Sequence, residues 1–418
     1  MLPCPMAKAE RKIHMINVAI LGFGVVGSGA AEVLSDNRAV IEQNLGTTVA
    51  VKRILDLRDF PDSPFGALVT HDFNDILSDP EISVVAEMMG GSHPAYDFTK
   101  ACLEAGKHVV TSNKEVVANF GAELLELAAK NGVRYLFEAS VGGGIPIIRP
   151  MVNDLASNAI VSVNGILNGT TNYILTQMIE NGTAYDVALK DAQQKGYAEA
   201  NPAADVEGLD AARKIVILAA LSFGTLLDPN KIHCEGITKL TAEDAETAKA
   251  LGCSVKLIGH TEKVDGKVLA MVSPRMIPLC NPLAGVADVF NGILVDANMV
   301  GEVMFYGKGA GKLPTASAVV ADIIDIVAHM GQDGVRAPRF TVATEGDYAD
   351  FAAYATKSCF SFADAPNAEA KIKAVFGEVK TVKVGSRIAF ISDAMTETDA
   401  AAKAQAVGLA LISRIRVL

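Results

Sequence analysis

Short apolar runs alternate with helix-like stretches over the first third of the chain. The first run, residues 16–21, is rich in β-branched residues and leads at once into a glycine turn and a helical pattern. Later runs lie at 49–55, 84–89, 108–111 and 134–137, and stretches such as 96–105 and 121–130 between them have helical spacing. Such alternation indicates a parallel sheet covered by helices on both faces. We therefore predict an α/β fold whose first domain, 16–137, is a Rossmann-type doubly wound parallel sheet.

The pattern changes character after Phe137. Glycine-rich turns at 142–144, a strand-like run at 160–167 and helical stretches at 170–180 and 185–195 predict a mixed α/β domain over 138–304. Near Gly307 the glycine-rich KGAGKLPTAS leads into an apolar helix, 316–330, long enough to return and pack on the first domain. We expect 305–330 to complete that domain.

The two ends of the chain are smaller units. Residues 350–418 read as short strands and helices with the spacing of a small α+β domain of βαββαβ type. Residues 1–15 lack a long apolar core and a cleavage signature, so they do not make a secretory signal, and we expect a flexible N-terminal extension.

Composition excludes several classes of protein. A chain of 418 residues is too long for one ordinary core, and its 50% hydrophobic and 20% charged residues are typical of globular proteins. The net charge of −11 repels nucleic-acid phosphates and anionic lipid. No apolar run approaches the roughly 20 residues that span a bilayer. We expect no nucleic-acid partner and no membrane insertion.

Cysteine usage indicates a reducing compartment. The six cysteines show no CxxC and no metal-ligand spacing, which favours free thiols and a cytoplasmic location. They are Cys4, Cys102, Cys234, Cys253, Cys280 and Cys359.

A glycine motif follows the first predicted strand. The segment GFGVVG has G-x-G-x-x-G spacing between a strand and a helix, the context in which this motif binds dinucleotides. The turn and the approach of a pyrophosphate tolerate no Cβ there, and the helix N-terminus attracts the anion. The alternative is a tight turn that binds nothing. The cofactor-binding residues predicted here are Gly22, Phe23, Gly24, Val25, Val26 and Gly27.

The choice between NAD and NADP stays open. Asp56, near the end of the second strand, would hold an adenosine ribose 2′-hydroxyl, whereas Arg58 would receive a 2′-phosphate.

Two carboxylates and an amine lie close together in the segment GYAEANPAADVEGLDAARK, residues 196–214. Asp210 and Lys214 are four residues apart, so a helix would place both side chains on one face. Glu199 precedes them. A carboxylate suits a substrate ammonium, and a lysine with a shifted pKa suits proton exchange with a hydroxyl. The alternative is an ordinary exposed ion pair.

This segment and three others together resemble homoserine dehydrogenases. The others are TSNKEVVA, FEASVGGGIPII and GILNGTTNYIL, at 111–118, 137–148 and 165–175. The likeness implies hydride transfer between NAD(P) and the pair L-homoserine and L-aspartate 4-semialdehyde, in the aspartate-derived route to threonine and methionine. A homo-oligomer, a dimer or larger, is also implied.

The resemblance implies roles for particular residues. Lys214 would exchange a proton with the substrate oxygen, with Asp210 as its orienting partner and Lys114 as a second lysine near the reacting oxygen. Glu199 would bind the substrate amine. Further cofactor contacts are implied at Gly90 or Gly91, Ser112, Lys114 and Gly311.

A monovalent cation, Na⁺, is implied near Glu138. Its oxygen ligands would be the Glu138 side chain or backbone and the carbonyls of Val141, Gly143 and Ile145. The alternative is a glycine-rich bend whose carbonyls meet water.

The C-terminal unit resembles a degenerate ACT domain, a small regulatory module. Its usual effector turn reads DAPNAE here, with Asn367 where glycine would let an effector approach the backbone. We expect the unit to support oligomer contacts.

Two other functions compete with this interpretation. One is another amino-acid or sugar dehydrogenase on the same scaffold, which would lack the NGTTNYIL and GYAE-to-ARK segments. The other is a non-catalytic nicotinamide-sensing regulator, for which a basic or helix-turn-helix module would be expected.

Overall fold

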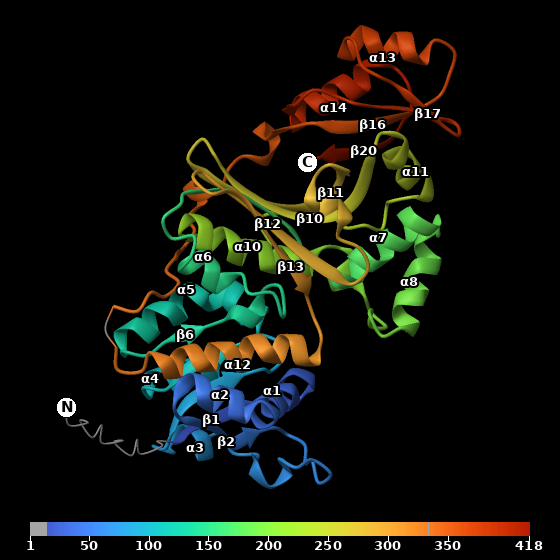
Figure 1. Ribbon diagram of the computed structural model, residues 1–418. Coiled ribbons are helices and arrows are strands. Elements are labelled where there is room, and N and C mark those ends of the chain that lie inside the picture. Colours follow the sequence, from blue (N-terminus) through green and yellow to red (C-terminus); the bar gives the residue numbers. More distant parts are fainter. Residues whose placement is uncertain (1–14, 333) are drawn as a thin grey trace, which may run out of the picture.

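The computed structural model describes residues 15–332 and 334–418 and shows three bodies stacked along one axis (Figure 1). A parallel sheet with its helices lies at one end, a mixed sheet with long helices in the middle, and the C-terminal unit at the other end. The predicted N-terminal extension falls outside the described residues, except that Met15 already belongs to the first strand.

The first sheet is six-stranded and parallel, in the order β3-β2-β1-β4-β5-β6. Alternate residues of β1 enter different cores, because successive strand side chains point to opposite faces. Val18 and Ile20 pack with one set of helices, and Ala19 and Leu21 with the other. The strands are β1 (Met15–Leu21), β2 (Thr48–Leu55), β3 (Val69–Thr70), β4 (Ile82–Glu87), β5 (His108–Thr111) and β6 (Tyr135–Leu136).

Helices cover both faces of this sheet, which confirms the doubly wound α/β class. One core contains residues of α1 and α12, and the other contains residues of α4 and α5. Helix α12 comes from far along the chain and packs on α1, where Gly29 lies so close that a Cβ would be 3.0 Å from the Lys312 carbonyl oxygen. The helices are α1 (Val25–Asp36), α2 (Arg38–Leu45), α3 (Asn74–Leu77), α4 (Ala95–Glu104), α5 (Lys114–Lys130) and α12 (Lys312–Ala328).

The middle body is built on a mixed sheet against which the long helix α10 (Leu209–Phe223) lies. Ten buried residues between Asp210 and Ala220 make α10 a core helix, and a Cβ on Gly259 of the sheet would be 3.2 Å from Ile215 of α10. Its strands are β7 (Ile160–Ile166), β9 (His233–Cys234), β10 (Cys253–Val264), β11 (Lys267–Pro278), β12 (Phe290–Ala297) and β13 (Gly301–Lys308). Its other helices are α6 (Ile148–Val152), α7 (Gly169–Asn181), α8 (Tyr185–Gln194), α9 (Ala203–Val206) and α11 (Ala242–Ala250).

The C-terminal unit has the predicted βαββαβ order of elements. Its strands and helices are β16 (Ser358–Ala363), α13 (Ala368–Phe376), β17 (Val382–Val384), β18 (Arg387–Ile391), α14 (Glu397–Ala406) and β20 (Leu411–Val417). Strand β20 also pairs in parallel with β11, with Arg275 opposite Arg416, so both bodies share one ten-stranded sheet. The sequence did not predict this pairing, and the relationship to ACT domains stays a prediction.

Short strands and turns of helix complete the described chain. The strands are β8 (Thr225–Leu226), β14 (Thr341–Val342), β15 (Ala355–Thr356) and β19 (Met395–Thr396). The 3₁₀ turns are η1 (Gly66–Leu68), η2 (Glu138–Ser140), η3 (Pro282–Gly285), η4 (Glu345–Asp347) and η5 (Phe351–Ala353).

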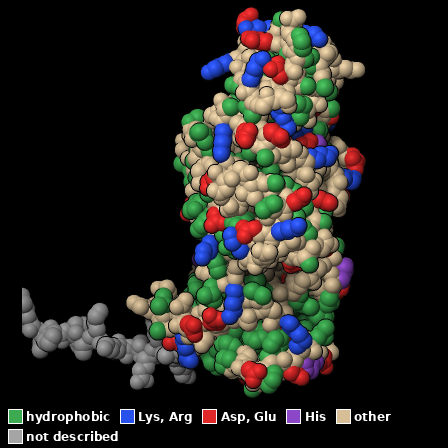
Figure 2. All heavy atoms as spheres, turned by 90° about the vertical axis from the view of Figure 1, so that its right-hand side faces the viewer, with side chains coloured by type: hydrophobic (Ala, Val, Ile, Leu, Met, Phe, Trp, Pro, Cys, Tyr) green, Lys and Arg blue, Asp and Glu red, His purple; other side chains and the backbone are tan. Residues whose placement is uncertain are grey.

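The described helices, cysteines and surface charges bear on membrane and nucleic-acid binding. None of the described helices is long and apolar enough to cross a membrane. The five described cysteines are free thiols, and Cys4 lies outside the described residues. Acidic and basic side chains intermingle over the face in Figure 2 and form no basic patch there.

Candidate active site

A buried carboxylate on α10 holds two lysines from different parts of the chain. Asp210 Oδ2 lies 2.8 Å from Lys214 Nζ, one helical turn further on, and Asp210 Oδ1 forms an ion pair with Lys114 at the start of α5. Asp210 and Lys214 are only 4% and 8% exposed. The alternative of an ordinary exposed ion pair is therefore wrong for this pair.

The hydrogen bonds of Lys214 leave one position on its nitrogen unoccupied. Nζ donates to Asp210 Oδ2 at 2.8 Å and to the Leu167 carbonyl, at the carboxyl end of β7, at 2.7 Å. A lysine ammonium has three N–H groups and the neutral amine has two and a lone pair. In either state the remaining position, a proton or a lone pair, is free to meet a third group.

The cluster shifts the proton affinities of its members in opposite directions. Burial alone would raise the pKa of Asp210, but the charges of Lys214 and Lys114 hold it well below its ordinary value. Burial lowers the pKa of Lys214, Asp210 opposes part of this, and the charge of Lys114 adds to the lowering. Lys214 therefore releases its proton more readily than an ordinary lysine does.

Asn168 joins this cluster to a second carboxylate. It is the N-cap of α7, and its side-chain oxygen accepts from the Thr171 amide at 2.9 Å. Its amide nitrogen donates to Asp205 Oδ1 at 2.7 Å and to Asp210 Oδ2 at 2.9 Å. Burial and the charge of Asp210 raise the pKa of Asp205. Asp205 therefore adds an acidic oxygen beside the lysine pair.

Glu199 lies on the exposed loop between α8 and α9. The loop is attached to α7 through Thr170 Oγ1, which donates to the Tyr197 carbonyl at 2.6 Å. Among the described residues, none forms an ion pair or hydrogen bond with the Glu199 side chain. Its carboxylate therefore has no partner within the described part of the chain, and it lies on the loop that leads to Asp205.

The glycine loop at the end of β1 has the geometry that the motif requires. Gly22 has a positive φ of 88°, and a Cβ on Gly27 would lie 2.0 Å from the Gly22 carbonyl oxygen. A Cβ on Gly24, by contrast, would meet nothing within 4 Å. The loop is thus tightly packed against the protein at Gly22 and Gly27. At Gly24, beside the N-terminus of α1, it leaves space in which a pyrophosphate could bind.

The other loop residues contribute unequally. The Phe23 ring is buried against Phe60 and Phe65, with ring centroids 5.0 and 6.2 Å away, so only its backbone faces the loop. Val25 is 68% exposed at the first turn of α1.

Asp56 is committed to contacts inside the protein. Its carboxylate accepts from the Phe23 amide at 2.8 Å and from the Arg58 Nε at 3.0 Å. Burial opposes the shift, but Arg58 and the Phe23 amide lower the pKa of Asp56 to about 2. Arg58 is 64% exposed at its side chain. The structure thus fixes Asp56 to the glycine loop and leaves Arg58 at the surface.

A cavity of about 510 Å³ lies beside this loop and brings some predicted cofactor residues together. Gly22, Gly24 and Gly90 line it, together with Asp56 and Arg58. Gly91 follows with a positive φ of 73°, and its carbonyl accepts from the Asn113 amide group at 2.8 Å.

Ser112, Lys114 and Gly311 lie outside the lining of this cavity. Ser112 follows β5, where its amide donates to the Glu87 carbonyl at 3.3 Å, and Lys114 opens α5. Gly311, with φ of 121°, is the N-cap of α12 next to α1. All three lie at element ends around the carboxyl edge of the first sheet.

The segment after η2 presents unengaged carbonyls. Gly142 and Gly143 both have positive φ, 74° and 56°, which turns the chain sharply. Among the described residues, none donates a hydrogen bond to the carbonyls of Val141, Gly143 or Ile145. The two Glu138 carboxylate oxygens instead accept from three amides at the start of α6, those of Ile147, Ile148 and Arg149, at 2.7, 2.7 and 2.8 Å. The option of a Glu138 side-chain ligand is not supported, because that carboxylate caps a helix.

Comparison with known proteins identifies the family. The family profile described as "Homoserine dehydrogenase, NAD binding domain" matches residues 22–138, and the profile "Homoserine dehydrogenase" matches 146–324. The homoserine dehydrogenase of Neisseria gonorrhoeae is 45% identical over 76% of this chain and 74% of its own length. That of Bacillus subtilis is 42% identical over 75% of this chain and 73% of its own length.

The chain belongs to the homoserine dehydrogenase family.

Solved homoserine dehydrogenases share the fold. The enzyme of Thiobacillus denitrificans superposes with a TM-score of 0.86 at 36% identity and covers 97% of this chain and 98% of its own. A hyperthermophilic archaeal homoserine dehydrogenase in complex with NADPH has a TM-score of 0.65 at 28% identity, over 76% of this chain and 99% of its own. The match over nearly the whole chain includes the C-terminal unit.

Family membership confirms the predicted activity. The chain is an NAD(P)-dependent oxidoreductase acting on a CH–OH group, the interconversion of L-homoserine and L-aspartate 4-semialdehyde. These matches favour homoserine dehydrogenase over both alternatives, another dehydrogenase and a nicotinamide-sensing regulator.

Two residues of the candidate site were not predicted from the sequence. Asn168 and Asp205 both lie in segments that carry the resemblance, but nothing local showed that Asn168 would bridge two carboxylates. The available signal was Asp205 itself, a second acidic residue shortly before Asp210. The bridge depends on the packing of α7 against α9 and α10.

Substitution of Gly24 tests the cofactor loop of this homoserine dehydrogenase. A Cβ at Gly24 meets no protein atom within 4 Å, so we expect the fold of a valine variant to persist, but the valine methyl groups would fill the space that a pyrophosphate needs. We expect Gly24→Val to keep the wild-type melting temperature and lose most affinity for NADPH, measured by fluorescence titration.

The matched control is Gly285→Val, which also adds a side chain in open space but lies in η3, away from the loop. Unchanged NADPH affinity in Gly24→Val would contradict the cofactor assignment.

Proposed function

We propose that Lys214 exchanges a proton with the substrate oxygen while Asp210 positions it and Lys114 adds positive charge beside it. The observation that carries this is the hydrogen bonding of Lys214, which commits two positions on its nitrogen to Asp210 and the Leu167 carbonyl. The third position becomes a donor when Lys214 is charged and a lone-pair acceptor when it is neutral.

The same arrangement serves both directions of the reaction. The bound nicotinamide supplies or takes up the hydride. In aldehyde reduction, negative charge grows on the substrate oxygen, where protonated Lys214 and Lys114 stabilise it before Lys214 donates its proton. In homoserine oxidation, neutral Lys214 takes the hydroxyl proton. The lowered pKa of Lys214 makes both forms accessible.

The carboxylates of Glu199 and Asp205 bind the substrate ammonium in this proposal. Glu199 has no side-chain partner among the described residues, and Asp205 accepts one hydrogen bond, from Asn168. Two carboxylates on one loop and helix junction favour a cationic group opposite the lysine pair.

NADP fits the adenosine end of the cavity better than NAD. The Asp56 carboxylate is occupied by the Phe23 amide and Arg58, while the Arg58 side chain stays exposed at the cavity. His71 also lines the cavity, and the carbonyl of Asp56 raises its pKa above the ordinary value. Two basic groups, Arg58 and His71, would favour a 2′-phosphate.

A Na⁺ ion fits the loop after η2. The unengaged carbonyls of Val141, Gly143 and Ile145, with the Glu138 carbonyl, are the hard oxygen ligands such an ion prefers. The ion would hold the loop that leads into α6.

Two further properties follow from the resemblance and the cysteine pattern. A homo-oligomer, a dimer or larger, and a cytoplasmic location stay predictions. The small-molecule substrate is the only other partner that we propose.

Replacement of Lys214 tests the proton-transfer role. Lys214→Ala removes the general acid and base, so we expect kcat to fall about 10²- to 10⁴-fold in both directions. NAD(P)H absorbance with L-aspartate 4-semialdehyde or L-homoserine measures this, and a small added amine should restore part of the rate.

The wild-type pH profiles should have opposite signs. Oxidation should rise with pH through the Lys214 pKa because the base must be neutral, and reduction should fall because the acid must be protonated. Full activity in Lys214→Ala, or profiles of the same sign, would contradict the assignment.

Arg58 determines the nicotinamide preference in this account. Arg58→Ala removes a charged donor to the 2′-phosphate, so KM for NADPH should rise about tenfold to 100-fold while KM for NADH stays unchanged. Arg38→Ala, another exposed arginine paired with a carboxylate but outside the cavity, is the control. Equal effects on NADPH and NADH would contradict the assignment.

Na⁺ should stabilise the fold by mass action because it binds the folded loop alone. We expect a higher melting temperature in NaCl than in N-methylglucamine chloride of equal ionic strength. An identical melting temperature in both salts across a wide concentration range would reject the cation site.

A further inference from the structure

Five residues lie between the C-terminal unit and the turn that leads to Asp210. We call residues 233–237 the strap. The strap begins with β9, which pairs with β11 opposite Met271 and Val272, and the Glu235 amide donates to the Val272 carbonyl at 2.8 Å. It lies between the central sheet and the turn that joins α9 to α10.

The strap is packed directly against the turn that leads to Asp210. The Ile237 amide donates to the Val206 carbonyl at 2.8 Å, and Cys234 Sγ donates to the Glu207 carbonyl at 3.3 Å. A Cβ on Gly236 would lie 2.1 Å from the Val206 carbonyl oxygen, so only glycine fits. Close packing transmits displacement, so a shift of the strap moves this turn.

The turn in question carries the acidic residues of the site. Asp205 is in α9, Gly208 is the left-handed N-cap of α10 with φ of 86°, and Asp210 lies in the first turn of α10. A Cβ on Gly208 would be 3.1 Å from Cys234 Sγ of the strap. The strap therefore limits where Asp210 can lie relative to Lys214.

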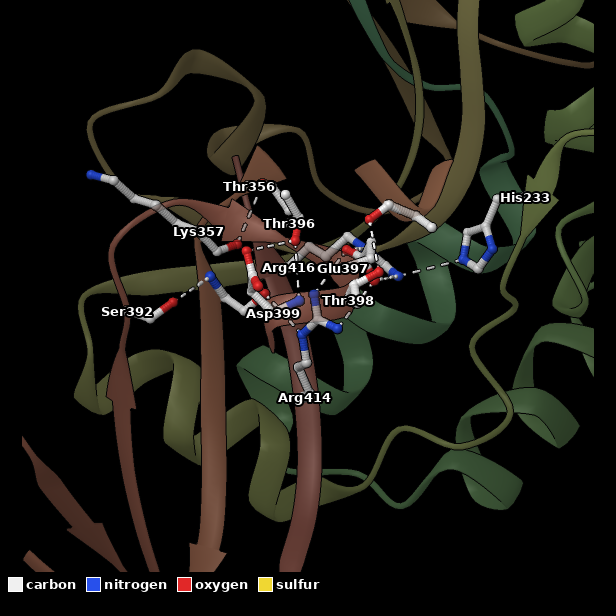
Figure 3. Close-up of polar contacts among 12 residues, drawn as sticks. His233, Thr356, Lys357, Ser392, Thr396, Glu397, Thr398, Asp399, Arg414 and Arg416 are labelled. Atoms are coloured by element: carbon white, nitrogen blue, oxygen red, sulfur yellow. Dashed lines mark hydrogen bonds and ion pairs between the residues drawn. The ribbon is translucent and has the colours of Figure 1, made fainter. Parts of the chain in front are cut away.

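The opposite side of the strap is held by an arginine from the last strand. Arg416 NH1 donates to Glu235 Oε2 at 3.0 Å, while Arg416 Nε and NH2 both bind Glu397 at 2.9 Å. Arg416 is only 6% exposed. Figure 3 shows Arg414 and Arg416 converging on Glu397, with His233 of the strap on the far side.

The strap's own side chains complete this contact. His233 Nε2 lies 2.6 Å from Glu235 Oε1, and the His233 ring stacks on Phe351 with centroids 3.7 Å apart. The Arg416 guanidinium lies over the same Phe351 ring at 5.1 Å. The His233 and Arg416 side chains, both packed on the Phe351 ring, thus hold the Glu235 carboxylate in one position.

We propose that Glu235 is a positioning residue for the reaction: through its ion pair with Arg416, the C-terminal unit sets the strap and thereby the position of Asp210 beside Lys214. This rests on the proposed roles of Asp210 and Lys214. It makes the C-terminal unit a structural part of catalysis without requiring any effector.

The test compares the two carboxylates that form ion pairs with Arg416, those of Glu235 and Glu397. Glu235→Gln loosens the strap, whereas Glu397→Gln removes the more buried partner, which binds both Arg414 and Arg416 inside the C-terminal unit. We expect kcat to fall about tenfold to 100-fold in Glu235→Gln, with KM for NADPH unchanged because the glycine loop is distant in the fold. Glu397→Gln should lower the melting temperature more and kcat less.

The pH profile separates positioning from mere stability. If Asp210 moves away from Lys214, the pKa of Lys214 falls, so the rising limb of homoserine oxidation in Glu235→Gln should move to lower pH. The control is Lys239→Ala, because Lys239 is exposed and lies just beyond the strap. This variant should leave kcat and the position of the rising limb unchanged. Should Glu235→Gln not fold, Arg416→Lys, which keeps the charge but cannot reach both carboxylates, answers the same question.

Each outcome decides something. Wild-type kcat and an unmoved limb in a folded Glu235→Gln or Arg416→Lys would overturn the positioning role, as would a larger kcat loss in Glu397→Gln. If the wild type itself lacks activity or Lys214→Ala keeps it, the proposed function fails instead.

Discussion

One buried carboxylate organises the lysine pair of the candidate active site. Asp210 holds Lys214 with one oxygen and Lys114 with the other, almost out of contact with water. Without it, two ammonium groups would repel each other in a site that burial already makes unfavourable for charge. With it, the Lys214 side chain is held in one direction, while burial still keeps the pKa of Lys214 below its ordinary value. Our proposal of reversible proton transfer needs both properties.

The groups around the Asp210 carboxylate come from three regions of the fold. Helix α10 fixes the Asp210–Lys214 spacing, the carboxyl end of β7 supplies the Leu167 carbonyl and Asn168, and α5 brings Lys114 from the nucleotide-binding sheet. Lys114 therefore connects the cofactor domain to the substrate domain through one ion pair. The strap and Arg416 extend the same set of contacts into the C-terminal unit.

What the sequence predicted and what it missed have distinct physical causes. The parallel sheet, the loop of Gly22 to Gly27 and the helical face shared by Asp210 and Lys214 follow from local periodicity and the steric needs of a turn. The role of Lys114 came through the family resemblance, since its ion pair spans distant elements. The Asn168 bridge, the Asp56 contact to the Phe23 amide and the pairing of β11 with β20 arise only when elements pack.

The pH dependence of homoserine oxidation by Asp210→Asn, compared with the wild type, tests the central claim most directly. Asparagine keeps the size of the side chain but removes the charge that opposes the lowering of the Lys214 pKa. The account predicts that the rising limb moves to lower pH and that kcat at its plateau falls, because Lys214 loses its orienting partner. A limb at the wild-type position with an undiminished plateau would show that Asp210 does not control Lys214.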